Sequence, residues 1–198
     1  MTGYRYYTAT TLDGFLADDQ DDLSWLLRQP IDADGPMNHG EFINGIGAIV
    51  MGATTYEWLL RHELGDGAPW PYQVPTYVFS HRDLTPATAA VHLVSGPPAE
   101  HRAAIESAAQ GRDVWVVGGG DLAAAFAAVG MLDEIIVSIA PVTLGSGRRL
   151  LGGAYDLALT EFDRNGAFLC ARYDVVGPLG TTDADSTLAD SPASAVAE

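Results

Sequence analysis

The sequence predicts an α/β fold with a mostly parallel central sheet of about eight strands and helices on both faces. Short apolar segments alternate with helical segments along most of the chain, which is the pattern of βαβ units. Two of the apolar segments end on glycine and run directly into a helix. Near the C-terminus, Asn165-Gly166 joins two further strand-like segments and predicts an antiparallel hairpin at one edge of the sheet.

Eight segments have the apolar or alternating composition of strands. The first opens the chain and is followed by Asp13-Gly14, a turn signal. The fifth is apolar on successive positions before Gly118, as expected for a strand that is buried on both faces. The predicted strands cover residues 4–11, 46–51, 75–80, 91–95, 113–117, 133–141, 157–164 and 167–176.

Five helical segments lie between these strands. Pro30 stops the first helix, Pro98 stands in the first turn of the fourth, and Gly130 follows the last. These are positions at which helices end or at which they tolerate proline. The predicted helices cover residues 23–29, 38–44, 54–62, 98–110 and 121–129.

Length and composition indicate one domain with a tail. A chain of 198 residues with 47% hydrophobic residues can bury one sizeable core. Residues 177–198 lack aromatic residues and are rich in Ser, Thr, Ala, Asp and Pro, so we expect a disordered acidic tail there. The predicted domain covers residues 1–176.

The charge of the chain excludes several kinds of partner. The formal net charge is −16, and all ten basic residues are arginines, so we expect no binding to nucleic acid or to anionic membranes. No segment resembles a signal peptide or a membrane span, which predicts a cytoplasmic protein. Cys170 is the only cysteine, and the histidines show no metal-ligand spacing, so we expect no disulfide within the chain and no metal.

Two glycine turns are the first candidates for a binding site. Gly118, Gly119 and Gly120 follow one predicted strand, and Gly52 follows another, with Thr54 and Thr55 at the start of the next helix. Helix N-termini attract anions, and parallel strands present their carboxyl ends at the same edge of a sheet. We therefore expect the two turns to hold a pyrophosphate from two sides. The alternative is that both are tight turns that allow close packing.

Four motifs together resemble a known family. They are "TTLDGFLA" at residues 10–17, "GATTYE" at 52–57, the three glycines at 118–120, and "LDEIIVSIAPVTLGSGRRLL" at 132–151. The chain resembles the dihydrofolate reductase superfamily over residues 4–176, in the branch of the C-terminal reductase domain of the bifunctional riboflavin-biosynthesis deaminase-reductase. The resemblance implies a dihydrofolate-reductase-like fold and an NADPH-dependent reductase that transfers a hydride to a pyrimidine- or pteridine-type heterocycle. Its expected partners are that small substrate and, as a homodimer, a second copy of the chain.

The resemblance also implies a set of cofactor-binding residues. Many dihydrofolate reductases carry a basic residue directly after the first glycine, where it meets the 2′-phosphate of NADPH, but this chain has Ala53. Ser80, His81 and Arg82 follow the third predicted strand and are the candidates to replace it; the alternative is an exposed turn. The implied cofactor-binding residues are Ala9, Leu16, Gly52, Thr54, Thr55, Ser80, His81, Arg82, Gly118, Gly119, Gly120, Asp121 and Leu122.

On the substrate side, the stretch "DDLSWLL" at residues 21–27 suggests a catalytic carboxylate. Asp22 matches the family position that binds the amidine-like edge of a pterin, and a carboxylate can accept two parallel hydrogen bonds from such an edge. The alternative is that Asp22 only caps the short helix. Trp25, Leu26 and Tyr56 are the implied substrate-binding residues, with core packing as the alternative.

Two further points stay open at this stage. The adjacent pair Arg148 and Arg149 is either a phosphate clamp or part of a solvated loop. A non-catalytic nucleotide-binding protein and a flavin-binding protein on the same fold are the alternatives to the reductase.

Overall fold

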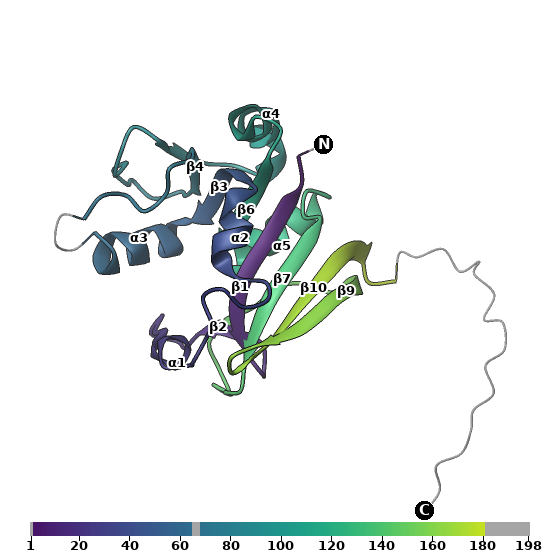
Figure 1. The fold of residues 1–198 in the computed structure, drawn as a ribbon. Coiled ribbons are helices and arrows are strands. Elements are labelled where there is room, and N and C mark those ends of the chain that lie inside the picture. The colour runs from purple at the N-terminus through teal and green to yellow at the C-terminus, as the bar shows by residue number, and fades with distance from the viewer. Residues whose placement is uncertain (1, 65–67, 181–198) are drawn as a thin grey trace, which may run out of the picture.

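The computed structural model describes residues 2–64 and 68–180, and its sheet is built around the first strand. β1 (Tyr4–Thr11) lies near the middle of an eight-stranded sheet of order β5-β4-β3-β6-β1-β7-β10-β9. The strands from β5 to β7 are parallel to one another, and β10 is antiparallel to both of its neighbours. Figure 1 shows the β9–β10 hairpin at one edge of this sheet. The predicted fold class is confirmed.

All eight predicted strands are present. β3 is buried along its first six residues. β6, the strand for which burial on both faces was expected, is buried at Val114, Trp115 and Val116 and half-buried at Val117. The main sheet contains, besides β1, β3 (Ile46–Gly52), β4 (Thr76–Phe79), β5 (Val91–Val94), β6 (Asp113–Gly118), β7 (Glu134–Ala140), β9 (Tyr155–Asn165) and β10 (Phe168–Pro178).

The last strand runs two residues further than the sequence predicted. Gly177 and Pro178 still pair with β9, and the amide of Leu179 donates to the carbonyl of Ala154 at 2.9 Å. The strand therefore continues past residue 176, where the predicted domain ended. Residues 181–198 of the expected tail lie outside the described residues.

The five predicted helices are present, and they cover both faces of the sheet. α2 begins after Asn38, whose side chain accepts a hydrogen bond from the amide of Glu41 at 2.8 Å, as expected of an N-cap. α4 carries Pro98 in its first turn. The helices are α1 (Ser24–Leu27), α2 (His39–Asn44), α3 (Ala53–His62), α4 (Pro98–Ala109) and α5 (Gly120–Ala128).

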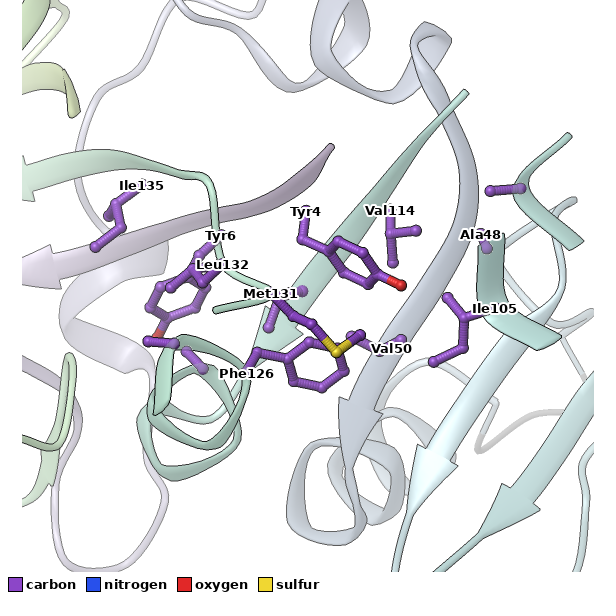
Figure 2. Packing of buried hydrophobic residues seen from close by; sticks show 14 of the residues in the cluster. Tyr4, Tyr6, Ala48, Val50, Ile105, Val114, Phe126, Met131, Leu132 and Ile135 are labelled. Carbon is purple, nitrogen blue, oxygen red and sulfur yellow. The ribbon is translucent and has the colours of Figure 1, made fainter. Parts of the chain in front are cut away.

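One face of the sheet packs against α4 and α5. Tyr4 and Tyr6 of β1 point to this face and belong to the same buried cluster as Ile105 of α4 and Phe126 of α5. Figure 2 shows Tyr4, Phe126 and Met131 gathered in this cluster, where the rings of Tyr4 and Phe126 lie 5.6 Å apart. The residues of this cluster are buried, and the cluster supports the sheet from one side.

The opposite face carries two smaller clusters. Tyr56 and Leu59 of α3 pack with Trp115 of β6 in the first, while Trp25 of α1 packs with Phe168 of β10 in the second. Successive residues of β1 contact opposite faces, because side chains alternate along a strand.

A second, two-stranded sheet is present that the sequence did not predict. β2 (Phe15–Ala17) pairs with β8 (Arg148–Arg149) in antiparallel fashion. Both strands are too short to show a pattern in the sequence. They join the segment after β1 to the segment after β7.

The hairpin turn has a second role that only the structure shows. Asn165, which is 2% exposed, accepts a hydrogen bond from the amide of Asp32 at 2.9 Å and donates to the carbonyls of Asp32 and Pro36. The amide of Ala167 donates to the carbonyl of Pro30 at 2.9 Å. The turn thus holds the segment 30–36 against the end of the sheet.

We predict that Asn165→Asp destabilises the protein by about 3 kcal/mol, because a carboxylate has no N–H for the carbonyl oxygens of Asp32 and Pro36 and places a charge at a buried position beside them. Asn44→Asp, at an exposed position of α2, is the matched control and should leave the free energy of unfolding nearly unchanged. Denaturant unfolding of both variants tests this, and equal stability of the two would contradict a stabilising role for the Asn165 side-chain hydrogen bonds.

Candidate functional site

The site begins where β1 separates from β6. These strands pair only from Tyr4 to Tyr6, against Val114 to Val116. Beyond this point β1 stays paired with β7 as far as Thr11, while β6 stays paired with β3 as far as Gly118. The sheet is therefore open between two parallel strands at their carboxyl ends, which is where α/β sheets bind ligands.

A cavity of about 280 Å³ lies at this opening, on the face of the sheet that carries α1 and α2. Ala9 and Leu26, which the sequence analysis assigned to the cofactor and the substrate, both line it. The remaining lining residues were not predicted. The lining residues are Tyr7, Thr8, Ala9, Leu26, Ile31, Trp115, Val117, Ser138 and Phe168.

Aromatic contacts fix the walls of the cavity. The indole Nε1 of Trp115 donates to the carbonyl of Tyr7 across the opening at 3.0 Å, so a side chain takes the place of a strand-to-strand bond. The hydroxyl of Tyr7 donates to the carbonyl of Met37 at 3.0 Å. Burial raises the pKa of Tyr7 to about 12, so this residue stays protonated at neutral pH. The strand composition of residues 4–11 and 113–117 was the only sequence signal for these positions.

Ser138 places a hydroxyl among these apolar walls. It belongs to β7, is 8% exposed, and its Oγ lies 3.4 Å from the Sγ of Cys170. A thiol is a weak hydrogen-bonding partner, so the serine hydroxyl can still bind a polar atom of a ligand. A single serine inside an apolar strand gave no sequence signal.

The two glycine turns lie side by side, directly beside the cavity. Val117 lines the cavity, and Gly118 is the next residue. An added Cβ on Gly52 would lie 3.7 Å from the carbonyl oxygen of Gly118. Gly52 precedes α3 and Gly119 precedes α5, and neither helix has a side-chain cap. Two helix N-termini with free N–H groups therefore meet at one point, where an anion is stabilised.

The three consecutive glycines are needed for three different reasons. Gly118 has φ +138°, a backbone conformation that L side chains rarely adopt. An added Cβ on Gly119 would meet nothing within 4 Å, so this position is open to a ligand. An added Cβ on Gly120 would lie 2.1 Å from the carbonyl oxygen of Arg149. Close packing, one of the two explanations of the sequence analysis, thus applies to Gly120. Anion binding at Gly119 stays a prediction.

The predicted phosphate residues are brought together beside the first glycine turn. Since β4 pairs with β3 as far as Phe79 and Gly52, the segment 80–82 leaves the sheet next to the start of α3. Arg82 donates to the hydroxyl of Thr54 at 3.2 Å and to a carboxylate oxygen of Glu57 at 2.5 Å. The amide of Arg82 donates to the hydroxyl of Ser80 at 2.8 Å. An arginine at a helix N-terminus is a natural partner for phosphate, although Glu57 already neutralises part of its charge.

The other predicted cofactor residues lie at the edges of this region. Asp121 and Leu122 are in the first turn of α5, and Leu16 lies in β2. Thr55 is half-buried in the first turn of α3, and His81 is exposed. Their binding roles stay predictions.

Two of the predicted substrate residues have core positions instead. Tyr56 is fully buried, and its hydroxyl donates to the carbonyl of Thr85 at 2.8 Å and accepts from the amide of Ala87 at 2.7 Å. Trp25 is 3% exposed and packs behind Phe168. Among the residues that the structure describes, neither lines the cavity, and both pack in the core; a contact of either with substrate stays a prediction. The apolar surface of each ring is buried in the hydrophobic core.

Asp22 lies at the entrance of α1 and outside the lining of the cavity. Its carboxylate accepts hydrogen bonds from the amide and the hydroxyl of Ser24. The bond from the Ser24 hydroxyl lowers the pKa of Asp22, so the group is ionised at neutral pH. These contacts hold the first residue of α1, although the N-cap itself is Leu23 and has no side-chain cap; a contact of Asp22 with substrate stays a prediction.

The arginine pair forms the exposed two-residue strand β8, and Arg148 is already paired; a phosphate-binding role for Arg149 stays a prediction. Arg148 binds the carboxylate of Asp21, with its Nε 2.7 Å from Oδ1, and Asp13 accepts the amides of Leu144 and Gly145 at 3.0 and 2.7 Å. The hydroxyl of Ser146 donates to Asp19. Three aspartates of the loop after β1 therefore bind the loop after β7, in addition to the β2–β8 pairing.

The sheet is mostly parallel and opens between two strands, beside two helices that each begin directly after a glycine. This is a dihydrofolate reductase-like architecture. Comparisons with known proteins agree with this. The model of the RibD C-terminal domain family matches residues 5–168. The chain therefore belongs to the RibD C-terminal domain family, a family of riboflavin-biosynthesis reductases.

Relatives and solved structures share most of this domain. The uncharacterized proteins YwjB and YyaP of Bacillus subtilis are 28% and 27% identical, over 71% and 72% of this chain and 78% and 76% of theirs. A putative riboflavin biosynthesis protein from a Shewanella species has a TM-score of 0.74 at 23% identity, covering 88% of this chain and 99% of its own. Acinetobacter baumannii RibD has a TM-score of 0.60 at 16% identity, over 88% of this chain and 58% of its own. The resemblance stated from the motifs is confirmed.

No helix within residues 2–64 and 68–180 is long and apolar enough to cross a membrane. The longest helix there is α4, with 12 residues, and about 20 apolar residues are needed to span a bilayer.

We predict that Gly119→Ala and Gly120→Ala differ in stability although they are neighbours. Gly120→Ala should lose about 2 kcal/mol, because its methyl group would overlap the Arg149 carbonyl, whereas Gly119→Ala should unfold like the parent. Thermal melts of the two variants, each the control of the other, test this. Equal melting temperatures would contradict the packing role of Gly120.

Proposed function

We propose that the protein is an NADPH-dependent reductase that transfers a hydride to a pyrimidine- or pteridine-type ring bound between β1 and β6. The observation that carries the proposal is the position of the aromatic-lined cavity directly beside the two glycine turns, with Val117 in one and Gly118 in the other. A Thermotoga maritima structure with a TM-score of 0.61 at 15% identity, of which this chain covers 56%, is a diaminohydroxyphosphoribosylaminopyrimidine deaminase/5-amino-6-(5-phosphoribosylamino)uracil reductase; this shared fold supports the reductase part of the proposal.

The residues at the turns fit a dinucleotide phosphate. The space beyond Gly119 is open, both helix starts lack side-chain caps, and Arg82 stands at the start of α3. The free N–H groups of α3 and α5 would hold the pyrophosphate, and Arg82 with Thr54 and Ser80 would hold the 2′-phosphate. NADPH, when bound, supplies the hydride.

The chain itself orients the substrate ring and provides the surface around it. The β1 backbone from Tyr7 to Ala9 has no ladder pairing with β6. The Tyr7 carbonyl accepts from Trp115, and the remaining polar groups on that side can orient a flat ring by hydrogen bonds. The Ser138 hydroxyl can bind a ring nitrogen or oxygen, while Trp115 and Phe168 supply apolar surface against which the ring can pack. A fixed orientation of the ring is what a hydride transfer requires from a protein.

Binding measurements test the cofactor half of this proposal. We expect Arg82→Ala to weaken NADPH binding about 10-fold and to leave NADH binding unchanged, because one exposed charge-assisted contact with the 2′-phosphate is lost. Gly119→Val should weaken both cofactors, because its side chain occupies the open space at the turn. Calorimetric titration of each variant gives the dissociation constants.

Arg61→Ala, at the other end of α3, is the control and should bind both cofactors as the parent does. NADPH binding by Arg82→Ala at the parent's affinity would remove Arg82 from the site. Normal cofactor binding by the parent without oxidation of NADPH in the presence of any pterin or pyrimidine would identify a nucleotide-binding protein rather than a reductase.

The variant Asp22→Asn separates the two roles of that residue. Asparagine caps a helix about as well as aspartate does, so the contacts with Ser24 predict an unchanged melting temperature and a turnover number close to the parent's. A substrate contact through the carboxylate would instead lower turnover by about two orders of magnitude at unchanged stability. Steady-state rates of NADPH oxidation distinguish these results.

A further inference from the structure

The walls of the cavity carry no charge. Of the nine described residues that line it, none has an ionised side chain; the polar groups are hydroxyls, backbone and the indole N–H of Trp115, which is bound to the Tyr7 carbonyl. An anion buried without a cation or several N–H donors costs several kcal/mol. A neutral ring has no such cost and gains from the apolar walls.

Two arginines on the same face are already paired. A neighbouring cavity of about 180 Å³ shares Tyr7 with the first and is lined by Arg5 and Arg172. Arg5 lies 2.9 Å from a carboxylate oxygen of Asp113, and Arg172 lies 3.1 Å from one of Glu134 and 3.0 Å from one of Glu161. Neither guanidinium is an uncompensated positive charge for a ligand in the first cavity.

The segments that carry Leu26 and Ile31 add negative charge around the cavity. Between residues 17 and 34 the sequence has one arginine, Arg28, and six aspartates. Asp21 is paired with Arg148, and the net charge of the whole chain is −16. Within a Debye length of about 8 Å, such a surface repels anions and not neutral molecules.

We infer that the cavity selects an uncharged, planar heteroaromatic ring and rejects substrates that carry a carboxylate or phosphate next to the ring. Trp115 and Phe168 pack on the ring, and Ser138 with the β1 backbone binds its ring nitrogens and oxygens. This inference rests on the proposed function, because it specifies the substrate of the same site. It separates this chain from a reductase that acts on a phosphorylated pyrimidine.

A matched pair of pterins tests the inference. 6-Hydroxymethylpterin and pterin-6-carboxylate share one ring system and differ in a single charge. Titration of the full chain, saturated with NADP⁺ at neutral pH and followed by pterin fluorescence, should show the neutral compound binding at least about 10-fold more tightly, since one unpaired buried charge costs at least this factor. Equal or tighter binding of the carboxylate would overturn the inference.

Failure of this inference and failure of the proposed function give different results. If neither pterin binds while NADP⁺ does, the substrate inference is overturned and the cofactor site stands. If NADP⁺ itself does not bind, the titration is repeated without it. The same preference for the neutral pterin would then support the inference although the proposed function had failed.

A charge introduced at the cavity should reverse the preference. Ile31 lines the cavity and is 57% exposed, so Ile31→Arg can place a guanidinium at the mouth without burying it. We expect this variant to bind the carboxylate about 10-fold more tightly than the parent does, as one charge-assisted hydrogen bond would provide. Leu27→Arg, in α1 and 76% exposed but outside the lining, carries the same added charge and should keep the parent's preference.

If Ile31→Arg and Leu27→Arg change the carboxylate affinity equally, overall charge and not the cavity lining controls selection, and the inference is overturned. Ser138→Ala gives an independent check, because it removes the hydroxyl and should weaken binding of the neutral pterin several-fold while the melting temperature stays close to the parent's.

Discussion

The separation of β1 from β6 after Tyr6 is the constraint on which the rest of the site depends. Each strand keeps its other neighbour, β7 for β1 and β3 for β6, so the opening costs only the hydrogen bonds on one side of each strand. Trp115 replaces one of these bonds by donating to the Tyr7 carbonyl. Because the sheet opens at the carboxyl ends of parallel strands, the helix that follows β6 starts at the edge of the cavity.

The segments over this opening are held by contacts with residues that are far away in the sequence. The loop after β1 is bound through Asp13, Asp19 and Asp21 to the segment 144–148, and the segment 30–36 is held by Asn165. These contacts join parts of the chain that are more than 120 residues apart. Side-chain bonds to backbone groups of this kind satisfy loops that have no sheet of their own, and they fix the residues that line the cavity.

The strongly acidic composition is compatible with an anionic cofactor, because the groups that would bind its phosphates and the exposed aspartates act over different distances. Helix N-termini and Arg82 act within a few ångströms of the glycine turns, whereas solvent and salt screen the exposed aspartates. Several of those aspartates are also structural, since Asp13, Asp21 and Asp113 bind backbone amides or arginines. The charge of the chain therefore affects which second ligand enters the apolar cavity more than it affects the turns.

The sequence by itself determined the order of the elements. Apolar periodicity located eight strands and five helices, and the Asn165-Gly166 and glycine-turn signals placed the hairpin and the helix starts, because backbone preference and burial are written into neighbouring residues. Family motifs added Ala9 and Leu26, which line the cavity.

Only the tertiary structure decided that Tyr56 and Trp25 are core residues and that Arg148 pairs with Asp21. It also decided that one cavity is surrounded by Ser138, Trp115, Ile31 and Phe168. These assignments depend on which strands lie side by side and where two of them part, and such long-range contacts leave no local pattern in the chain.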